Sequence, residues 1–240
     1  MTGPKLSPYV SIAWASCPRW AVQESADLIG IIESPAGRTC AVLIDVQGTG
    51  ASPRRMGHAL MLDARSMLSG GVSADLAVHA LNQHLHSRRD GQVGAAILIA
   101  SIAPERYRAE LAGYGDIVVA VRENGEWTRH EIRGGLAGHD PGANPDCRVI
   151  SLEKEAMLVV SSDGLGRTGD GFGALLHGLN PNLRPAGAVS ELIRSAVARD
   201  EGRPSADMAS IAIQVALEGS DVPVEQGEFM RRVNVKSARP

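Results

Sequence analysis

The stretch VLIDVQGTGAS, residues 42–52, combines an apolar run, an aspartate at its end and a turn with two spaced glycines. A short apolar run that is bounded by turn residues is typical of a buried strand. Asp45 is therefore expected at the end of a strand, with the glycines in the loop that follows. Such a junction can serve two chemistries, because it can cradle a dinucleotide phosphate or hold a metal ion through Asp45.

The dinucleotide interpretation conflicts with the residues around this loop. The GxGxxG fingerprint needs a third glycine, and Pro53 stands at that position. The carboxylate of Asp45 would also bring negative charge to a site that has to attract a pyrophosphate. The fingerprint further belongs to a strand–helix–strand unit, whereas two helical segments follow this loop. We therefore interpret the loop as support for a metal ligand.

A second segment has the same design. MLVVSSDGLG, residues 157–166, is again an apolar run that leads to Asp163 and Gly164. Two aspartates at the ends of different strands can meet at one edge of a sandwich. Their oxygens suit hard cations such as Mg²⁺ or Mn²⁺, and without a cation the carboxylates would repel each other. Each aspartate alone is equally compatible with a turn or a helix cap, so the metal hypothesis depends on the pair.

The composition is that of a soluble globular protein. The chain has 240 residues, 44% of them hydrophobic and 21% charged, and a formal net charge of −3. Nucleic-acid binding is not expected, because it needs a basic surface. No run approaches the roughly 20 apolar residues of a membrane span, so we expect no membrane association. The three cysteines are widely spaced without a CxxC pair, which predicts reduced thiols in a cytoplasmic protein.

The order of the expected elements predicts an α+β fold. Strands precede Asp45, two helices follow at about residues 52–68 and 73–85, and a dense series of strands comes next. Asn124 and Gly125 lie between two apolar runs, which indicates a tight hairpin of antiparallel strands. A second helix pair and one last strand complete the pattern.

These elements predict an antiparallel β-sandwich flanked by helices on both faces. We expect one domain over residues 1–218 and a polar tail over residues 219–240. For the first helix, Ser52 is predicted as the N-cap and Pro53 as the first helical residue.

Five segments of the chain together resemble one enzyme family. They are AVLIDVQGTGAS, AMLVVSSDGLGRT, the opening SIAWASCPRWAVQESADLIGI, the middle segment that ends in AGYGDIVVAV, and SADMASIAIQV near the end. In order and spacing they resemble the type 2C (PPM) metal-dependent serine/threonine phosphatases, in the bacterial branch that includes SpoIIE, RsbU and RsbX. The resemblance covers about residues 11–215 and is greatest to RsbX. It implies the PPM-type αββα sandwich.

The resemblance also implies a site with two Mn²⁺ or Mg²⁺ ions. The positions that match the family's ligands are Asp27, Asp45, the backbone carbonyl of Val46, Asp163 and Asp207. Asp45 would contact both ions and, with Asp163, form the catalytic centre. The implied substrate is a phosphoserine or phosphothreonine on a regulatory protein, such as a STAS-domain anti-anti-sigma factor or a stressosome component in a partner-switching stress pathway.

One position departs from the family pattern. The last motif of the family begins with two acidic residues, of which the first binds metal, and here Ala206 precedes Asp207. Either Asp207 reaches the metal through a shifted strand start, or one ligand is missing. The second case favours an alternative function, in which a catalytically weak pseudophosphatase binds such a partner without efficient turnover. A hydrolase of small phosphate esters is a third hypothesis.

Two arginines and two histidines also have positions that suggest a functional role. Arg54 and Arg55 follow the Asp45 loop, and arginine can bind a substrate phosphate through two hydrogen bonds. His84 and His86 are two positions apart on a helix and so do not face each other, which argues against a shared metal. The sequence is compatible with a monomer or a homodimer.

Overall fold

Strand β3 (Thr39–Val46) carries Asp45 near its C-terminal end and lies inside a five-stranded antiparallel sheet. Ala41 and Leu43 belong to the core between the two sheets, whereas Val42 and Ile44 belong to the core under the helices. Because both faces of the strand are covered, its sequence is an almost continuous apolar run. The sheet has the order β2-β3-β4-β5-β8, with β2 (Leu28–Glu33), β4 (Ala95–Ala103), β5 (Arg108–Tyr114) and β8 (Asp146–Ser151).

The second sheet has six strands in the order β11-β1-β10-β9-β6-β7. They are β1 (Pro8–Cys17), β6 (Val118–Glu123), β7 (Glu126–Glu131), β9 (Met157–Ser161), β10 (Met208–Leu217) and β11 (Val233–Val235). All its pairs are antiparallel except β1 with β11. Asn124 and Gly125 join β6 to β7 with φ values of 51° and 87°, as a tight primed turn requires, so the predicted hairpin is confirmed.

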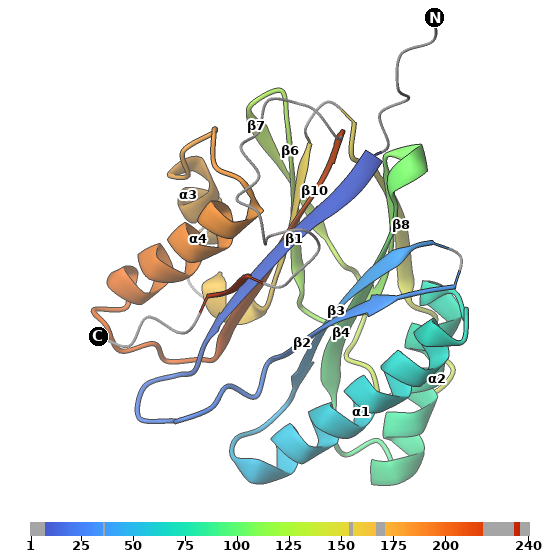
Figure 1. The fold of residues 1–240 in the computed structure, drawn as a ribbon. Helices are drawn as coiled ribbons and strands as arrows, with labels where there is room; N and C mark the ends of the chain where they lie inside the picture. The colour runs from blue at the N-terminus through green and yellow to red at the C-terminus, as the bar shows by residue number, and fades with distance from the viewer. Residues whose placement is uncertain (1–7, 36, 154–155, 167–170, 218–232, 236–240) are drawn as a thin grey trace, which may run out of the picture.

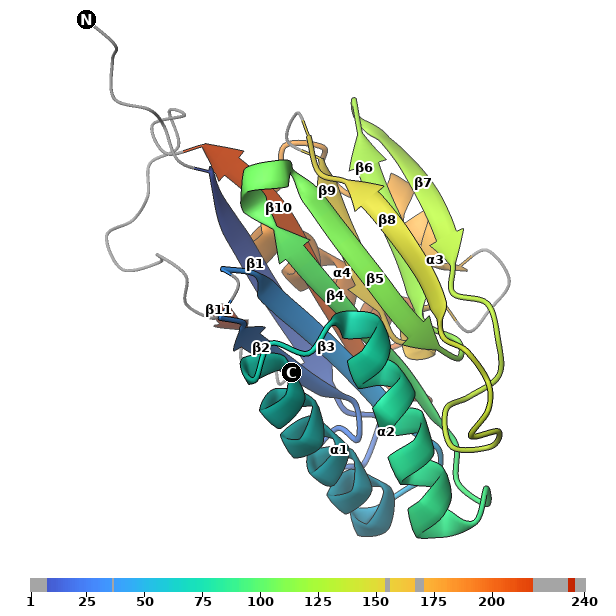
Figure 2. The same cartoon turned by 90° about the vertical axis from the view of Figure 1, so that its right-hand side faces the viewer.

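Helices cover both outer faces of the sandwich (Figures 1 and 2). Helices α1 (Ala51–Ser69) and α2 (Ala74–Arg89) pack on the five-stranded sheet, and α3 (Gly171–His177) and α4 (Pro185–Arg199) pack on the six-stranded sheet. Short 3₁₀ turns η1 (Pro104–Arg106) and η2 (Asp163–Leu165) follow β4 and β9. The predicted α+β sandwich with helices on both faces is confirmed.

This computed structural model describes residues 8–35, 37–153, 156–166, 171–217 and 233–235. Within the predicted tail of residues 219–240, only 233–235 are therefore described, and they form β11, which the sequence did not indicate. In the described part of the chain, no helix is both long enough and apolar enough to cross a bilayer.

The start of α1 differs from the prediction. The N-cap is Gly50 and the helix begins at Ala51, so Ser52 and Pro53 lie in the first turn instead of capping it. Gly50 has a φ of 89°, a conformation that glycine adopts without strain and that reverses the chain before the helix. Proline is tolerated in the first turn because the N–H groups there have no partner within the helix.

Candidate metal centre

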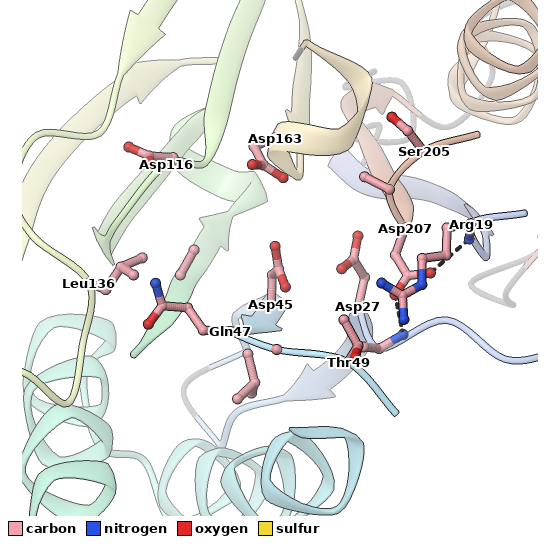
Figure 3. Close-up of a pocket in the computed structure, with 15 residues that line it drawn as sticks. Arg19, Asp27, Asp45, Gln47, Thr49, Asp116, Leu136, Asp163, Ser205 and Asp207 are labelled. Carbon is pink, nitrogen blue, oxygen red and sulfur yellow. Dashed lines mark hydrogen bonds between the residues drawn. The ribbon is translucent and has the colours of Figure 1, made fainter. Parts of the chain in front are cut away.

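One cavity collects acidic side chains from both sheets (Figure 3). Its lining includes all five residues predicted as metal ligands, which are Asp27, Asp45, Val46, Asp163 and Asp207. Asp45 comes from the end of β3, and Asp163 opens η2 directly after β9 in the other sheet. The structure therefore brings together the two strand ends whose matching sequences suggested a shared site.

Asp27 lies one residue before β2 and is only 6% exposed. Its Oδ2 atom is buried and has no hydrogen-bond partner among the described residues. Burial, and then the nearby carboxylate of Asp45, raise the pKa of Asp27 to about 8, with smaller contributions from Asp207 and Asp163, while a hydrogen bond with Ser162 opposes the rise. The environment of Asp27 therefore disfavours its negative charge as long as no cation is nearby.

Ser162 orients this aspartate, and the sequence analysis did not identify it. The side chain is 1% exposed, and its Oγ accepts the backbone N–H of Ala209 at 2.9 Å. The hydroxyl hydrogen of Ser162 therefore remains to be donated to the Asp27 carboxylate, with which it makes a side-chain hydrogen bond. The only signal in the sequence was the pair of polar residues between the apolar run of β9 and Asp163.

Asp207 has a different environment, although it lines the same cavity. Its Oδ1 accepts the backbone N–H of Arg19 at 2.8 Å, and its Oδ2 accepts the backbone N–H of Ala26 at 2.9 Å. Figure 3 shows the Asp27, Asp45 and Asp163 carboxylates around the centre of the cavity, while the carboxylate of Asp207 is directed toward Arg19. Asp207 thus fixes the loop between β1 and β2.

Asp116 is another acidic residue that the sequence analysis missed. It follows Gly115, which has a φ of 81°, in the turn between β5 and β6, and its side chain is exposed. It lines the same cavity as Asp45 and Asp163. The available signal was an aspartate in the turn after a strand, but here glycine precedes the aspartate, whereas glycine follows Asp45 and Asp163.

The donor set fits a hard divalent cation. Among the described residues, no three His, Cys, Asp or Glu side chains already surround one point as a complete metal site. The buried Oδ2 of Asp27 nevertheless has an open acceptor position beside the carboxylates of Asp45 and Asp163. A buried carboxylate needs a compensating partner, and all-oxygen donors select Mg²⁺ or Mn²⁺ over softer metals.

The predicted phosphate-binding arginines line an adjoining cavity. Arg54 and Arg55 lie there with His58 in the first turns of α1, and this second cavity shares Arg19 and Asp207 with the first. Arg54 forms an ion pair with Glu24 of the β1–β2 loop. The two arginines are therefore beside the acidic centre, but they are not among the residues that line it.

Two other histidines lie outside both cavities and have structural partners. Nδ1 of His84 is 3.0 Å from Oδ2 of Asp63, and Nδ1 of His86 is 2.9 Å from the backbone oxygen of Gly138. These contacts agree with the expectation that the two histidines share no metal.

The chain matches one known protein family and resembles several solved structures. The model of the family "Stage II sporulation protein E (SpoIIE)" matches residues 35–216, and no curated protein sequence matches the chain. The solved PP2C phosphatase domain of SpoIIE from Bacillus subtilis, with a fragment of its regulatory domain, superposes with a TM-score of 0.76 at 15% identity, over 89% of this chain and 65% of that one. The present chain thus spans less than two thirds of that SpoIIE structure.

Two further solved structures match most of this chain over almost the whole of their own length. The serine/threonine phosphatase of S. agalactiae has a TM-score of 0.71 at 17% identity, over 86% of this chain and 99% of that one. RsbX in complex with magnesium has a TM-score of 0.67 at 14% identity, over 88% and 100% of the two chains. At these identities the likeness establishes the fold, and the predicted PPM-type architecture is confirmed.

Proposed function

Since this chain belongs to the SpoIIE family, whose fold is that of the PP2C serine/threonine phosphatases, we propose that it is a metal-dependent phosphoprotein phosphatase. It would remove phosphate from a serine or threonine of a regulatory protein. The metal would be Mn²⁺ or Mg²⁺, and the resemblance to the family implies two ions.

The buried Oδ2 of Asp27 is the observation that carries this proposal. It has no hydrogen-bond partner among the described residues, and it lies in the cavity that Asp45 and Asp163 also line. A structural aspartate would use its oxygens in hydrogen bonds, as a buried polar group normally does. An acceptor that is kept unsatisfied next to other carboxylates is better explained by a cation that binds there.

Each proposed ligand lies at or next to the end of a strand of the sandwich. Asp45 and Asp163 would be the catalytic ligands, with Asp27 and the carbonyl of Val46 completing the set. Ser162 would hold the Asp27 carboxylate toward the cavity through its hydroxyl. A bound Mn²⁺ or Mg²⁺ would activate water near neutral pH and neutralise the charge on the transferring phosphoryl group.

Arg54 and Arg55 are proposed to bind the substrate phosphate from the adjoining cavity. Guanidinium groups suit this role because their planar fork matches phosphate oxygens. Arg54 already pairs with Glu24, so an incoming phosphorylated residue would have to compete with this carboxylate. Arg55 is exposed at the same rim.

The substrate is proposed to be a phosphorylated STAS-domain anti-anti-sigma factor or a stressosome component in a partner-switching stress pathway. Similarity to SpoIIE and RsbX supports this choice of substrate class. All three cysteines are free thiols, which suits the reducing cytoplasm. The proposed enzyme acts as a monomer or a homodimer.

A second candidate function rests on Ala206. This residue lines the cavity at the position where the family has an acidic ligand. A chain that lacks one ligand would bind the same phosphoprotein and release it slowly or unchanged. In that case the protein is a pseudophosphatase and a binding module.

Hydrolysis of a phosphoserine peptide and of p-nitrophenyl phosphate, each with Mn²⁺ and with EDTA, tests the proposal. Turnover that requires Mn²⁺ and is abolished in Asp163→Asn supports the phosphatase. Glu126→Gln, an exposed residue at the start of β7, is the matched control and should behave as the wild type. Absence of turnover together with tight binding of a phosphorylated STAS domain would support the binding module instead.

A further inference from the structure

We infer that Asp207 is a positioning residue and not a metal ligand, so that the centre lacks a carboxylate at Ala206 and holds one divalent ion. This inference deepens the proposed function and rests on it. It decides between the two possibilities that the sequence left open, a shifted strand start and a missing ligand.

The hydrogen bonds of Asp207 assign its carboxylate to the β1–β2 loop. One oxygen accepts from Arg19 and the other from Ala26, at 2.8 and 2.9 Å. These two residues lie toward opposite ends of the loop, so a single side chain fixes the path of the chain that leads to Asp27. Hydrogen bonds from backbone N–H groups to a carboxylate are charge-assisted and hold the side chain in one orientation.

The backbone of Asp207 has no room for a shifted strand start. The pairing of β1 with β10 is continuous from Pro8 and Leu217 to Cys17 and Met208, the residue after Asp207. On the other side of β10, Ala209 exchanges hydrogen bonds with Ser162, through its N–H at 2.9 Å and its carbonyl at 3.0 Å. A shift by one residue would break both sets of bonds and exchange the face of β10 in the core between the sheets with the face that packs against the outer helices.

Gly164 closes the remaining space around Asp207. A Cβ atom at Gly164 would lie 1.9 Å from the backbone oxygen of Asp207. The turn after β9 therefore touches the start of β10 directly, and the Asp207 backbone is held from this side as well. The backbone of Asp207 therefore cannot shift unless the turn that carries Asp163 also shifts, and its carboxylate reaches the centre only if its hydrogen bonds with Arg19 and Ala26 break.

Three carboxylates then remain around the centre of the cavity, those of Asp27, Asp45 and Asp163, while Asp116 lies exposed beyond Asp163 (Figure 3). Ala206 contributes only a methyl group to the same lining. An ion that used a carboxylate at position 206 has therefore lost a ligand in this chain, whereas an ion held by Asp27, Asp45 and Asp163 keeps its ligands. The missing fourth carboxylate is thus expected to cost the centre one of the two ions that the family pattern implies.

Mn²⁺ binding to the full chain, measured by titration calorimetry together with thermal unfolding of the metal-free protein, tests the inference. We expect one Mn²⁺ per wild-type chain and two per Ala206→Asp chain. Ala206→Asn, which has the same size without the charge, is the matched control and should bind one ion. Asp207→Asn should keep a stoichiometry of one, with roughly tenfold weaker affinity because the loop that carries Asp27 is less well held.

The Tm of the metal-free Asp207→Asn protein also distinguishes a positioning role from a ligand role. Loss of one charge-assisted hydrogen bond should lower its Tm by roughly 5 °C, whereas loss of a metal ligand would leave this Tm unchanged or raise it. Two ions per wild-type chain, or a stoichiometry that falls in Asp207→Asn, would overturn the inference and leave the phosphatase proposal standing. Absence of both Mn²⁺ binding and turnover in the wild type would overturn the proposed function, and the inference with it.

Discussion

Asp27 and Asp207 occupy matching positions in the two sheets and are used in opposite ways. Each stands one residue before a strand, β2 for Asp27 and β10 for Asp207, and both line one cavity. Both oxygens of Asp207 accept backbone N–H groups, whereas one oxygen of Asp27 is buried with no hydrogen-bond partner among the described residues. A carboxylate whose two oxygens already accept hydrogen bonds from the backbone holds a loop in place. A carboxylate that keeps one oxygen without such a partner can bind a cation with it.

The largest difference should appear in catalysis. We expect Asp27→Asn to lower kcat/KM for a phosphoserine peptide by about 10²-fold or more, because it removes charge from the proposed centre. Asp207→Asn should cost about tenfold, since it acts only through the loop. Steady-state kinetics at saturating Mn²⁺ give both values. Equal losses in the two variants would mean that Asp27 and Asp207 have the same role.

The next difference concerns stability and its dependence on pH. The folded metal-free protein keeps Asp27 protonated up to about pH 8, whereas its ordinary pKa is 3.8. The folded state therefore binds more protons than the unfolded state in this range, and the contribution of Asp27 to the free energy of unfolding is lost as the pH rises from 3.8 to about 8. Asp27→Asn has no such loss.

When both proteins are unfolded thermally in EDTA, only the wild type should lose the contribution of Asp27 as the pH rises from 5 to 8. The Tm of Asp27→Asn minus the Tm of the wild type should therefore increase over this range. Asp207→Asn is the contrasting variant, and its Tm should lie below that of the wild type throughout the same range. A Tm difference between Asp27→Asn and the wild type that does not change with pH would mean that Asp27 is not held protonated.

Ser162 offers a smaller test of how Asp27 is positioned. Ser162→Ala removes the hydroxyl that bonds to Asp27 and leaves the Ala209 N–H without its acceptor, at a cost of about 1–3 kcal/mol. We expect a Tm lowered by a few degrees and Mn²⁺ affinity weakened by about tenfold. Ser161→Ala is the control, because Ser161 is equally buried but bonds to the hydroxyl of Ser210. If both variants bind Mn²⁺ equally, Ser162 has no role beyond packing.

The smallest effect is expected at the rim of the adjoining cavity. Arg55→Ala should raise KM for a phosphopeptide a few-fold and leave kcat unchanged, since an exposed ion pair contributes little. Arg54→Ala should have a similar effect, reduced by the ion pair that Arg54 already makes with Glu24. A fall in kcat with no change in KM would place the arginines in catalysis and not in phosphate binding.

Much of the fold and part of the centre could be predicted because the responsible signals are local. The apolar runs before Asp45 and Asp163 predicted two strand ends, and the positive φ values of Asn124 and Gly125 are those that the predicted hairpin turn needs. The start of α1 was misplaced because the deciding feature is the backbone conformation of Gly50. Local sequence does not reveal which of several nearby residues adopts it.

The roles of Ser162 and Asp207 could not be predicted, because they depend on contacts between distant segments. The bonds from Asp207 to Arg19 and Ala26 span 188 and 181 residues. The bond between Ala209 and Ser162 spans 47 residues. A motif comparison places an aspartate at position 207, but only the packed strands show where its oxygens are directed.

The most direct test of a metal centre built on Asp27, Asp45 and Asp163 is the anomalous diffraction of Mn²⁺ in crystals of the wild-type protein. We expect one Mn²⁺ peak in the cavity, in contact with carboxylate oxygens from this set, with both backbone hydrogen bonds of Asp207 intact. A peak ligated by Asp207 would contradict the assignment of this residue to the loop. No peak in the cavity at saturating Mn²⁺ would contradict the metal centre itself.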